Sequence, residues 1–121
     1  MDVLSLLLQA PIPEMPEKGY KLKRLSSICG SPVIFKLKGL PYNRAMELTK
    51  TQMDDLNVHI LLAGVVEPNL RDTELLAKYE AATPGELVKK MLLPGEIEDL
   101  SRAIEKLSGY REITIEEIKK K

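Results

Sequence analysis

The stretch ILLAGVVEPNL, residues 60–70, decides the fold of this 121-residue chain. Residues 58–65, which overlap its first half, are apolar on nearly every side, and this is typical of a helix buried at the centre of a domain. Asn57 is placed to cap the start of that helix. Pro68 predicts its end, because the residue before a proline is disfavoured in the helical region.

Three more helices are predicted after this core helix. Asp72 is a predicted N-cap for residues 73–79. The motif TPGEL, residues 83–87, combines a threonine N-cap, a proline at the first helical position and a glutamate three residues after the cap. The motif LPGEI, residues 93–97, is a second proline-led start. The apolar stripe that follows it ends before Gly109 and consists of Ile97, Leu100, Ile104 and Leu107.

Weaker helical signals flank these four helices. Residues 42–56 carry a sparse stripe with an interruption at residues 49–51. Its apolar members are Ala45, Met46, Leu48, Met53 and Leu56. At the other end, a capping box at residues 114–117 predicts a short last helix.

A β-hairpin is expected before the helices. Residues 20–25 begin by alternating apolar and basic side chains, and residues 32–38 alternate again with Val33, Phe35 and Leu37 facing one way. Residues 26–31 are rich in turn formers and are interpreted as the connecting loop. Because two strands alone are not stable in water, helices or another chain must cover the apolar face.

The N-terminus combines a short apolar helix with a stiff connector. Asp2 is placed to cap the helix, and three prolines within residues 11–16 hold the following chain extended. Helical spacing puts one apolar face on the helix, formed by Val3, Leu4, Leu7 and Leu8. A helix this short is marginal alone, so we expect it to dock on the body of the protein or on a neighbouring copy.

Composition argues against catalysis. The 18 basic and 18 acidic residues balance, so no global field attracts nucleic acid or an anionic membrane. Cys29 and His59 are the only cysteine and histidine, too few for the usual closed zinc site, and nothing around Cys29 resembles a nucleophile motif. We therefore predict no catalytic, metal or cofactor-binding residues. The single cysteine, and the lack of a signal peptide or membrane span, favour a cytoplasmic protein.

One charge cluster keeps a nucleic-acid alternative open. Basic residues gather on or beside the predicted hairpin, where they could contact phosphates: Lys18, Lys21, Lys23, Arg24, Lys36, Lys38 and Arg44. The nearby aromatic residues do not form an interleaved stacking set, and the helices are neutral or acidic. Lysines on a sheet edge also block unwanted strand pairing. We favour this role over nucleic-acid binding for the basic residues.

The order of these segments resembles the XkdN-like tail assembly chaperones of contractile-tailed phages, PBSX-type prophages and phage-like bacteriocins. The leucine helix, the proline connector and the basic strand-like segment fit as well. The segments that carry the resemblance are residues 60–70, LLAKY at 75–79, ATP at 82–84, MLLPGEI at 91–97 and KLSGY at 106–110.

The resemblance implies a chaperone that binds the helical tape measure protein during tail assembly, helps recruit tail-tube subunits and is absent from the mature virion. It supplies no catalytic residues. We predict Leu4, Leu7 and Leu8 as the partner-binding face, or alternatively as a self-association face. Adaptable contacts could also come from Met15, Met46, Met53 and Met91. The competing interpretations are a structural tail accessory protein retained in the particle and a small DNA-binding regulator.

The predicted fold class is α+β, with a small N-terminal β-hairpin and a mainly helical C-terminal body of four to six short helices. One domain is expected over residues 1–121. It divides into an N-terminal helix at 1–10, a proline-rich connector at 11–17, the hairpin at 18–40 and the helical body at 41–121.

Overall fold

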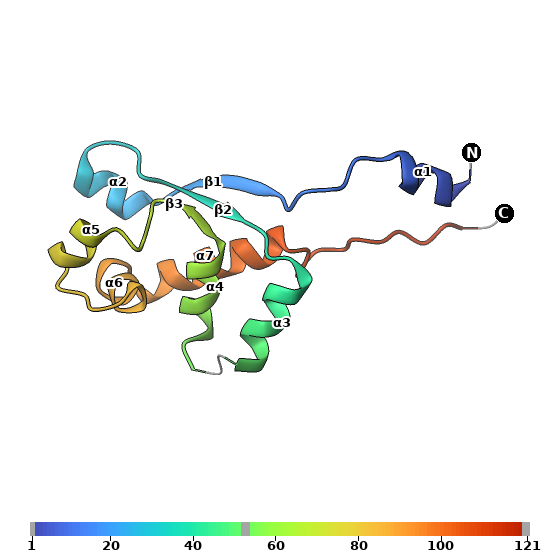
Figure 1. Ribbon diagram of the computed structural model, residues 1–121. Coiled ribbons are helices and arrows are strands. Elements are labelled where there is room, and N and C mark those ends of the chain that lie inside the picture. Colours follow the sequence, from blue (N-terminus) through green and yellow to red (C-terminus); the bar gives the residue numbers. More distant parts are fainter. Residues whose placement is uncertain (1, 52–53, 120–121) are drawn as a thin grey trace.

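The computed structural model describes residues 2–51 and 54–119 and has an α+β architecture, as predicted. A three-stranded sheet lies across one side of a group of helices, and α1 stands apart from both (Figure 1). The elements in chain order are α1 Val3–Gln9, β1 Glu17–Lys21, α2 Lys23–Cys29, β2 Ile34–Lys38, α3 Tyr42–Thr51, α4 Leu56–Gly64, β3 Val65–Glu67, α5 Thr73–Lys78, α6 Pro84–Met91 and α7 Pro94–Leu107.

The predicted hairpin is present, and a third strand completes the sheet. β1 pairs with β2 and β2 with β3, both antiparallel, in the order β1-β2-β3. Phe35 and Leu37 of β2 are buried while Ile34 and Lys36 are exposed, so the alternation in the sequence marks the core face correctly. β3 begins where we expected the core helix to end, because the chain leaves α4 at Gly64 and turns extended at Val65.

α4 is the central helix, as its sequence predicts. Val58, Ile60 and Leu61 are buried, and the helix packs against α3, α6 and α7. The predicted N-cap is wrong: Asp55 precedes the helix with a φ of 56°, and no side chain caps its first turn. Asn57 lies inside the helix, where its side chain reaches α7 instead.

Gly64 sets the close approach of α4 and α7. A Cβ atom built at Gly64 would lie 2.6 Å from side-chain atoms of Ile104, which is fully buried. A side chain at this position would therefore separate the two helices or displace Ile104. The glycine at the end of the core helix is a packing residue as well as a helix terminus.

The predicted starts of α5 and α6 are confirmed. Asp72 accepts a hydrogen bond from the Glu74 N–H at 3.2 Å, and the Thr83 hydroxyl accepts one from the Glu86 N–H at 3.2 Å. α7 carries the predicted apolar stripe with Leu107 partly buried, and the chain turns at Gly109 with a φ of 95°. The helical body thus contains α3 to α7, five helices among the described residues.

The predicted loop at residues 26–31 is wrong, because residues 23–29 form α2. Leu25 and Ser26 are buried on this helix, and Gly30 ends it in the left-handed region with a φ of 71°. The Ser26 hydroxyl donates to the Leu22 carbonyl at 2.6 Å and accepts from the Val33 N–H at 2.8 Å. These two bonds join α2 to the residue after β1 and to the residue before β2. Ser26 is therefore a helix residue that links the two strands, and not a turn residue.

The short last helix predicted after Thr114 is also wrong. Residues 113–119 form no helix and are exposed throughout. The capping-box residues lack a docked apolar stripe behind them, and a helix of this length is not stable without one.

α3 ends at Thr51, close to the predicted interruption, with Ala45 and Leu48 buried. Met53, part of the predicted stripe and of the predicted set of adaptable methionines, lies outside the described residues.

Candidate partner-binding surfaces

α1 is formed locally, by its own cap. The Asp2 carboxylate accepts a hydrogen bond from the Ser5 N–H at 2.8 Å, and the Leu6 N–H donates to the Asp2 carbonyl at 3.1 Å. The bond from the Ser5 N–H lowers the pKa of Asp2, so the cap stays charged at neutral pH. The Ala10 N–H closes the last turn on the Leu6 carbonyl. The predicted N-terminal helix is therefore present and capped as expected.

The predicted partner-binding residues are all exposed on this helix. The exposed fractions are 64% for Leu4, 70% for Leu7 and 75% for Leu8. Val3 and Leu6 are exposed as well, so at about 100° per residue the apolar side chains span an arc of about 200°. Ser5 and Gln9 fill the remaining sector. The apolar face is wider than the predicted one, and it lies on a helix with no buried residue.

Two terminal segments extend from the same side of the body (Figure 1). We call residues 2–16 the N-terminal arm and residues 112–119 the C-terminal tail. Of the fifteen large hydrophobic residues that are exposed in the described chain, nine lie in these segments. They are Val3, Leu4, Leu6, Leu7, Leu8, Ile12, Ile113, Ile115 and Ile118. The body buries most of its apolar side chains and the arm and tail do not, so the arm and the tail are candidate contact surfaces.

A groove of about 360 Å³ lies on the body between α3, α4 and α7. Its apolar floor consists of Leu40, Ala45, Leu48, Leu56, Ile60 and Ile104, and polar side chains of Asn57, Glu105 and Arg111 form part of its rim. Sequence reasoning missed this groove, because its walls come from separate helices whose apolar stripes look like ordinary core positions. Incomplete filling between packed helices leaves no sequence signal.

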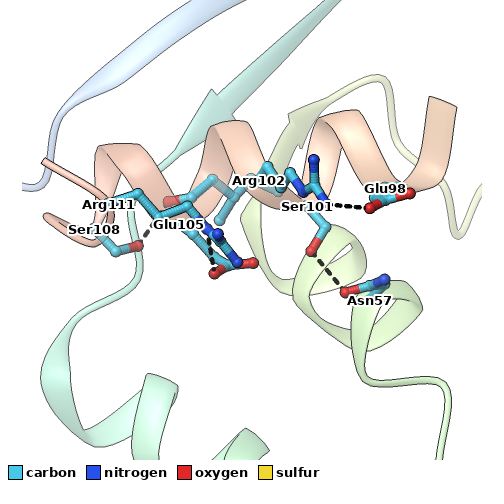
Figure 2. A network of polar contacts seen from close by, with 8 residues as sticks. Asn57, Glu98, Ser101, Arg102, Glu105, Ser108 and Arg111 are labelled. Carbon is cyan, nitrogen blue, oxygen red and sulfur yellow. Dashed lines mark hydrogen bonds and ion pairs between the residues drawn. The ribbon is translucent and has the colours of Figure 1, made fainter. Parts of the chain in front are cut away.

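Polar contacts along α7 fix one wall of the groove (Figure 2). The buried Ser101 hydroxyl donates to the Asn57 side chain of α4 at 3.2 Å, and the Arg111 guanidinium donates to Glu105 at 3.2 Å. Arg102 and Glu98 pair on the exposed side of the same helix. These contacts connect α7 to α4 at Asn57 and hold Arg111 against the end of α7.

The predicted adaptable methionines do not gather into one surface. Met46 and Met91 are partly buried and pack against the core. Met15 is half-buried in the connector, with its terminal methyl 3.0 Å from the position of a Cβ at Gly39. These three methionines fill gaps between elements, which is the more ordinary use of methionine.

The histidine and the cysteine, the side chains considered for catalysis or metal binding, lie on different helices. His59 is half-buried in α4, and Cys29 is exposed at the end of α2. No group of three or more histidine, cysteine or acidic side chains within residues 2–51 and 54–119 could hold a metal ion. None of the helices in this part of the chain is long and apolar enough to cross a membrane.

Four of the seven basic residues near the hairpin have acidic partners. Lys36 and Lys38 both pair with Glu17 across the sheet, at 3.2 and 3.7 Å. Arg24 donates two hydrogen bonds to Glu96, at 2.8 and 3.2 Å, which lower the pKa of that carboxyl. Arg44 pairs with Glu47 at 3.1 Å. This leaves Lys18, Lys21 and Lys23, a set too small for an extended phosphate-binding ribbon.

The fold and the sequence both match known proteins. The sequence model of the phage XkdN-like tail assembly chaperone proteins matches residues 42–120, which include the whole helical body. A crystal structure of the protein YqbN, solved by a structural genomics consortium, superposes with a TM-score of 0.67 over 91% of this chain and 98% of that one, at 23% sequence identity. That structure supports the fold. No curated protein matches.

The class defined by this fold is that of a small α+β protein with an exposed apolar arm. The chain belongs to the XkdN-like tail assembly chaperone family.

Proposed function

We propose that this chain binds the tape measure protein during tail assembly, through the apolar face of α1. The observation that carries the proposal is the exposure of Leu4, Leu7 and Leu8 on a capped helix that makes no core contact. A long helical protein exposes apolar seams until the tail tube encloses it, and such seams aggregate. An amphipathic helix can cover a seam by packing its leucines against it.

The attachment of α1 suits reversible binding. The connector is extended and carries Pro11, Pro13 and Pro16, which limit its conformations while keeping α1 away from the sheet. Binding through α1 therefore requires no rearrangement of the body. A helix that is already formed also loses less conformational entropy on binding than a disordered segment would.

The finer role extends the family assignment. We propose a non-enzymatic chaperone that works in the cytoplasm of the bacterial host, helps recruit tail-tube subunits around a tape measure in a contractile tail and leaves before the virion matures. The rival is a structural accessory protein retained in the tail. Mass spectrometry of purified tails separates the two: a chaperone is absent from intact particles, whereas an accessory protein is present in fixed stoichiometry.

Co-expression tests tape measure binding directly. The tape measure protein should stay in the supernatant when it is co-expressed with this chain and should precipitate when it is expressed alone. The variant Leu7→Asp/Leu8→Asp should lose this effect, and Gln9→Asp, on the polar sector of α1, should keep it. Equal tape measure solubility with and without the chain contradicts the proposal.

A further inference from the structure

We propose that two copies of this chain associate by exchanging their C-terminal tails, each tail adding a strand to the free edge of β1 in the other copy. This exchange of tails does not depend on tape measure binding, so the purified chain alone is sufficient to test it.

The outer edge of β1 has backbone groups available for pairing. β1 is the first strand of the sheet and has β2 on one side only. The Gly39 N–H donates to the Pro16 carbonyl at 3.0 Å and the Leu22 N–H to the Val33 carbonyl at 2.9 Å, so even-numbered residues of β1 face β2 in the ladder. The N–H and C=O groups of Glu17, Gly19 and Lys21 consequently point away from the sheet. Such an edge is a template for another strand, and the lysines on it oppose pairing with a neutral or basic strand but attract an acidic one.

Gly19 lies at the middle of this edge. It has no side chain, and the nearest atom to a Cβ built there belongs to Ile34, at 3.2 Å. Ile34 is 57% exposed on the face of the sheet away from the core. An incoming strand can therefore approach closely at Gly19 and place an apolar side chain beside Ile34.

The tail has the sequence of a strand and not of the helix first expected. Residues 112–119 read EITIEEIK, with Ile113, Thr114 and Ile115 forming a β-branched run of alternating polarity and no proline. Ile113 and Ile115 are 95% and 85% exposed. An exposed apolar strand of this kind is stabilised when it pairs with a sheet edge.

The direction of the tail favours a second copy over the same chain. Glu112 lies near Pro16 and Lys18, at the start of β1, and the tail then runs outward, away from the sheet and toward the same side as the N-terminal arm (Figure 1). Pairing within one chain would require a reversal directly after α7. A twofold-related copy facing this end of the molecule receives the tail without a reversal and returns its own.

Charges on the two surfaces are complementary. Lys18, Lys21 and Lys23 lie on or beside the β1 edge, and Glu112, Glu116 and Glu117 lie on the tail. None of these six side chains takes part in an ion pair within the described part of the chain. The formal net charge of the whole chain is zero, so no general repulsion opposes self-association.

Charge reversal with recombination tests the exchange. Sedimentation velocity of the full chain, from about 1 μM to about 1 mM, should show a monomer–dimer equilibrium. Lys18→Glu/Lys21→Glu reverses the charge of the edge, and Glu112→Lys/Glu116→Lys reverses the charge of the tail. The dimer of each variant alone should have a dissociation constant at least tenfold higher than that of the parent chain. An equal mixture of the two should form dimers again, because both junctions of the mixed dimer are complementary.

Controls exclude loss of folding and general charge effects. Circular dichroism should show the same helical content in every variant, and Lys50→Glu/Lys78→Glu, which reverses two exposed lysines away from β1, should dimerise like the parent chain. Three results would overturn the proposal. They are a monomer at every concentration, a dimer that persists in the reversed variants, and tail amides protected from hydrogen exchange in a species that sediments as a monomer.

Discussion

The body and the N-terminal arm use the same kind of residue for opposite purposes. Leu61 of α4 is fully buried between helices, whereas Leu7 of α1 is 70% exposed on a helix without a buried residue. Both segments are apolar and helical, and both are read from the sequence as helices. Their neighbours make the difference: α4 is enclosed by α3, α6 and α7, and α1 is held away by a proline-rich connector. Stability therefore resides in the body, and contact with partners is assigned to the arm.

The largest expected effect separates these two leucines. Leu61→Ala leaves a cavity in a fully buried site and should lower the free energy of unfolding by about 3 kcal/mol. Leu7→Ala should change it by less than about 0.5 kcal/mol, because the side chain is mostly in water already. Urea unfolding followed by circular dichroism measures both. Similar losses in the two variants would mean that α1 packs on the body.

Gly64 and Gly95 allow a comparison of crowded and open glycine positions inside the body. Gly64→Ala places a methyl group 2.6 Å from Ile104 and should destabilise the protein by about 1–3 kcal/mol. Gly95→Ala, whose Cβ meets no atom within 4 Å at the start of α7, should be neutral or stabilise by less than about 1 kcal/mol. A Gly64→Ala/Ile104→Ala double variant should lose less stability than the two single losses added together. Strict additivity would show that the two positions do not touch.

The two side-chain caps provide a smaller contrast. Thr83→Ala removes the cap of α6 in the body and should cost about 1 kcal/mol. Asp2→Ala removes the cap of α1 and should leave the unfolding midpoint unchanged while the Leu6 amide exchanges faster. Hydrogen exchange by NMR and thermal unfolding report the two effects separately. A shift of the global midpoint in Asp2→Ala would show that the arm unfolds together with the body.

A pH-dependent effect of smaller size is expected at Glu96. The hydrogen bond from Arg24 holds the pKa of this carboxyl below its ordinary value of 4.5, so its ionised form contributes stability above that pH. The contribution is lost as the pH falls through the lowered pKa of the folded state. The parent chain should therefore have a larger free energy of unfolding than Glu96→Gln at neutral pH, and this difference should shrink below pH 4.5. The effect is modest because Arg24 is 36% exposed. A difference that grows on acidification would contradict the assignment.

The sequence predicts the elements whose signals are local. The caps at Asp2, Asp72 and Thr83, the proline-led starts and the stripe of α7 need only neighbouring residues, and all are present. The predicted loop at residues 26–31 and the predicted last helix are wrong because both outcomes depend on tertiary contacts. Alternation at residues 20–25 concealed the start of α2, which Ser26 stabilises through bonds to two other segments. The capping box after Thr114 has no surface on which its helix could dock.

The candidate surfaces were predictable to different degrees. The leucine face of α1 could be found because a proline connector separates it from the rest of the chain. The groove between α3, α4 and α7 could not, because it depends on how closely three helices meet. The free edge of β1 was hidden for a related reason: strand order is a property of the sheet, and the sequence alone does not place β1 outside β2 and β3.

The affinity of the purified chain for soluble fragments of the tape measure protein, measured by isothermal titration calorimetry, tests the central claim most directly. The account predicts that Leu7→Asp weakens binding at least tenfold, a loss of about 1.4 kcal/mol, while the unfolding midpoint stays unchanged. Gln9→Asp, the same charge on the polar sector of the same helix, should bind within twofold of the parent chain. Equal affinities for the parent and Leu7→Asp would contradict the claim that the arm, and not the body, makes the contact.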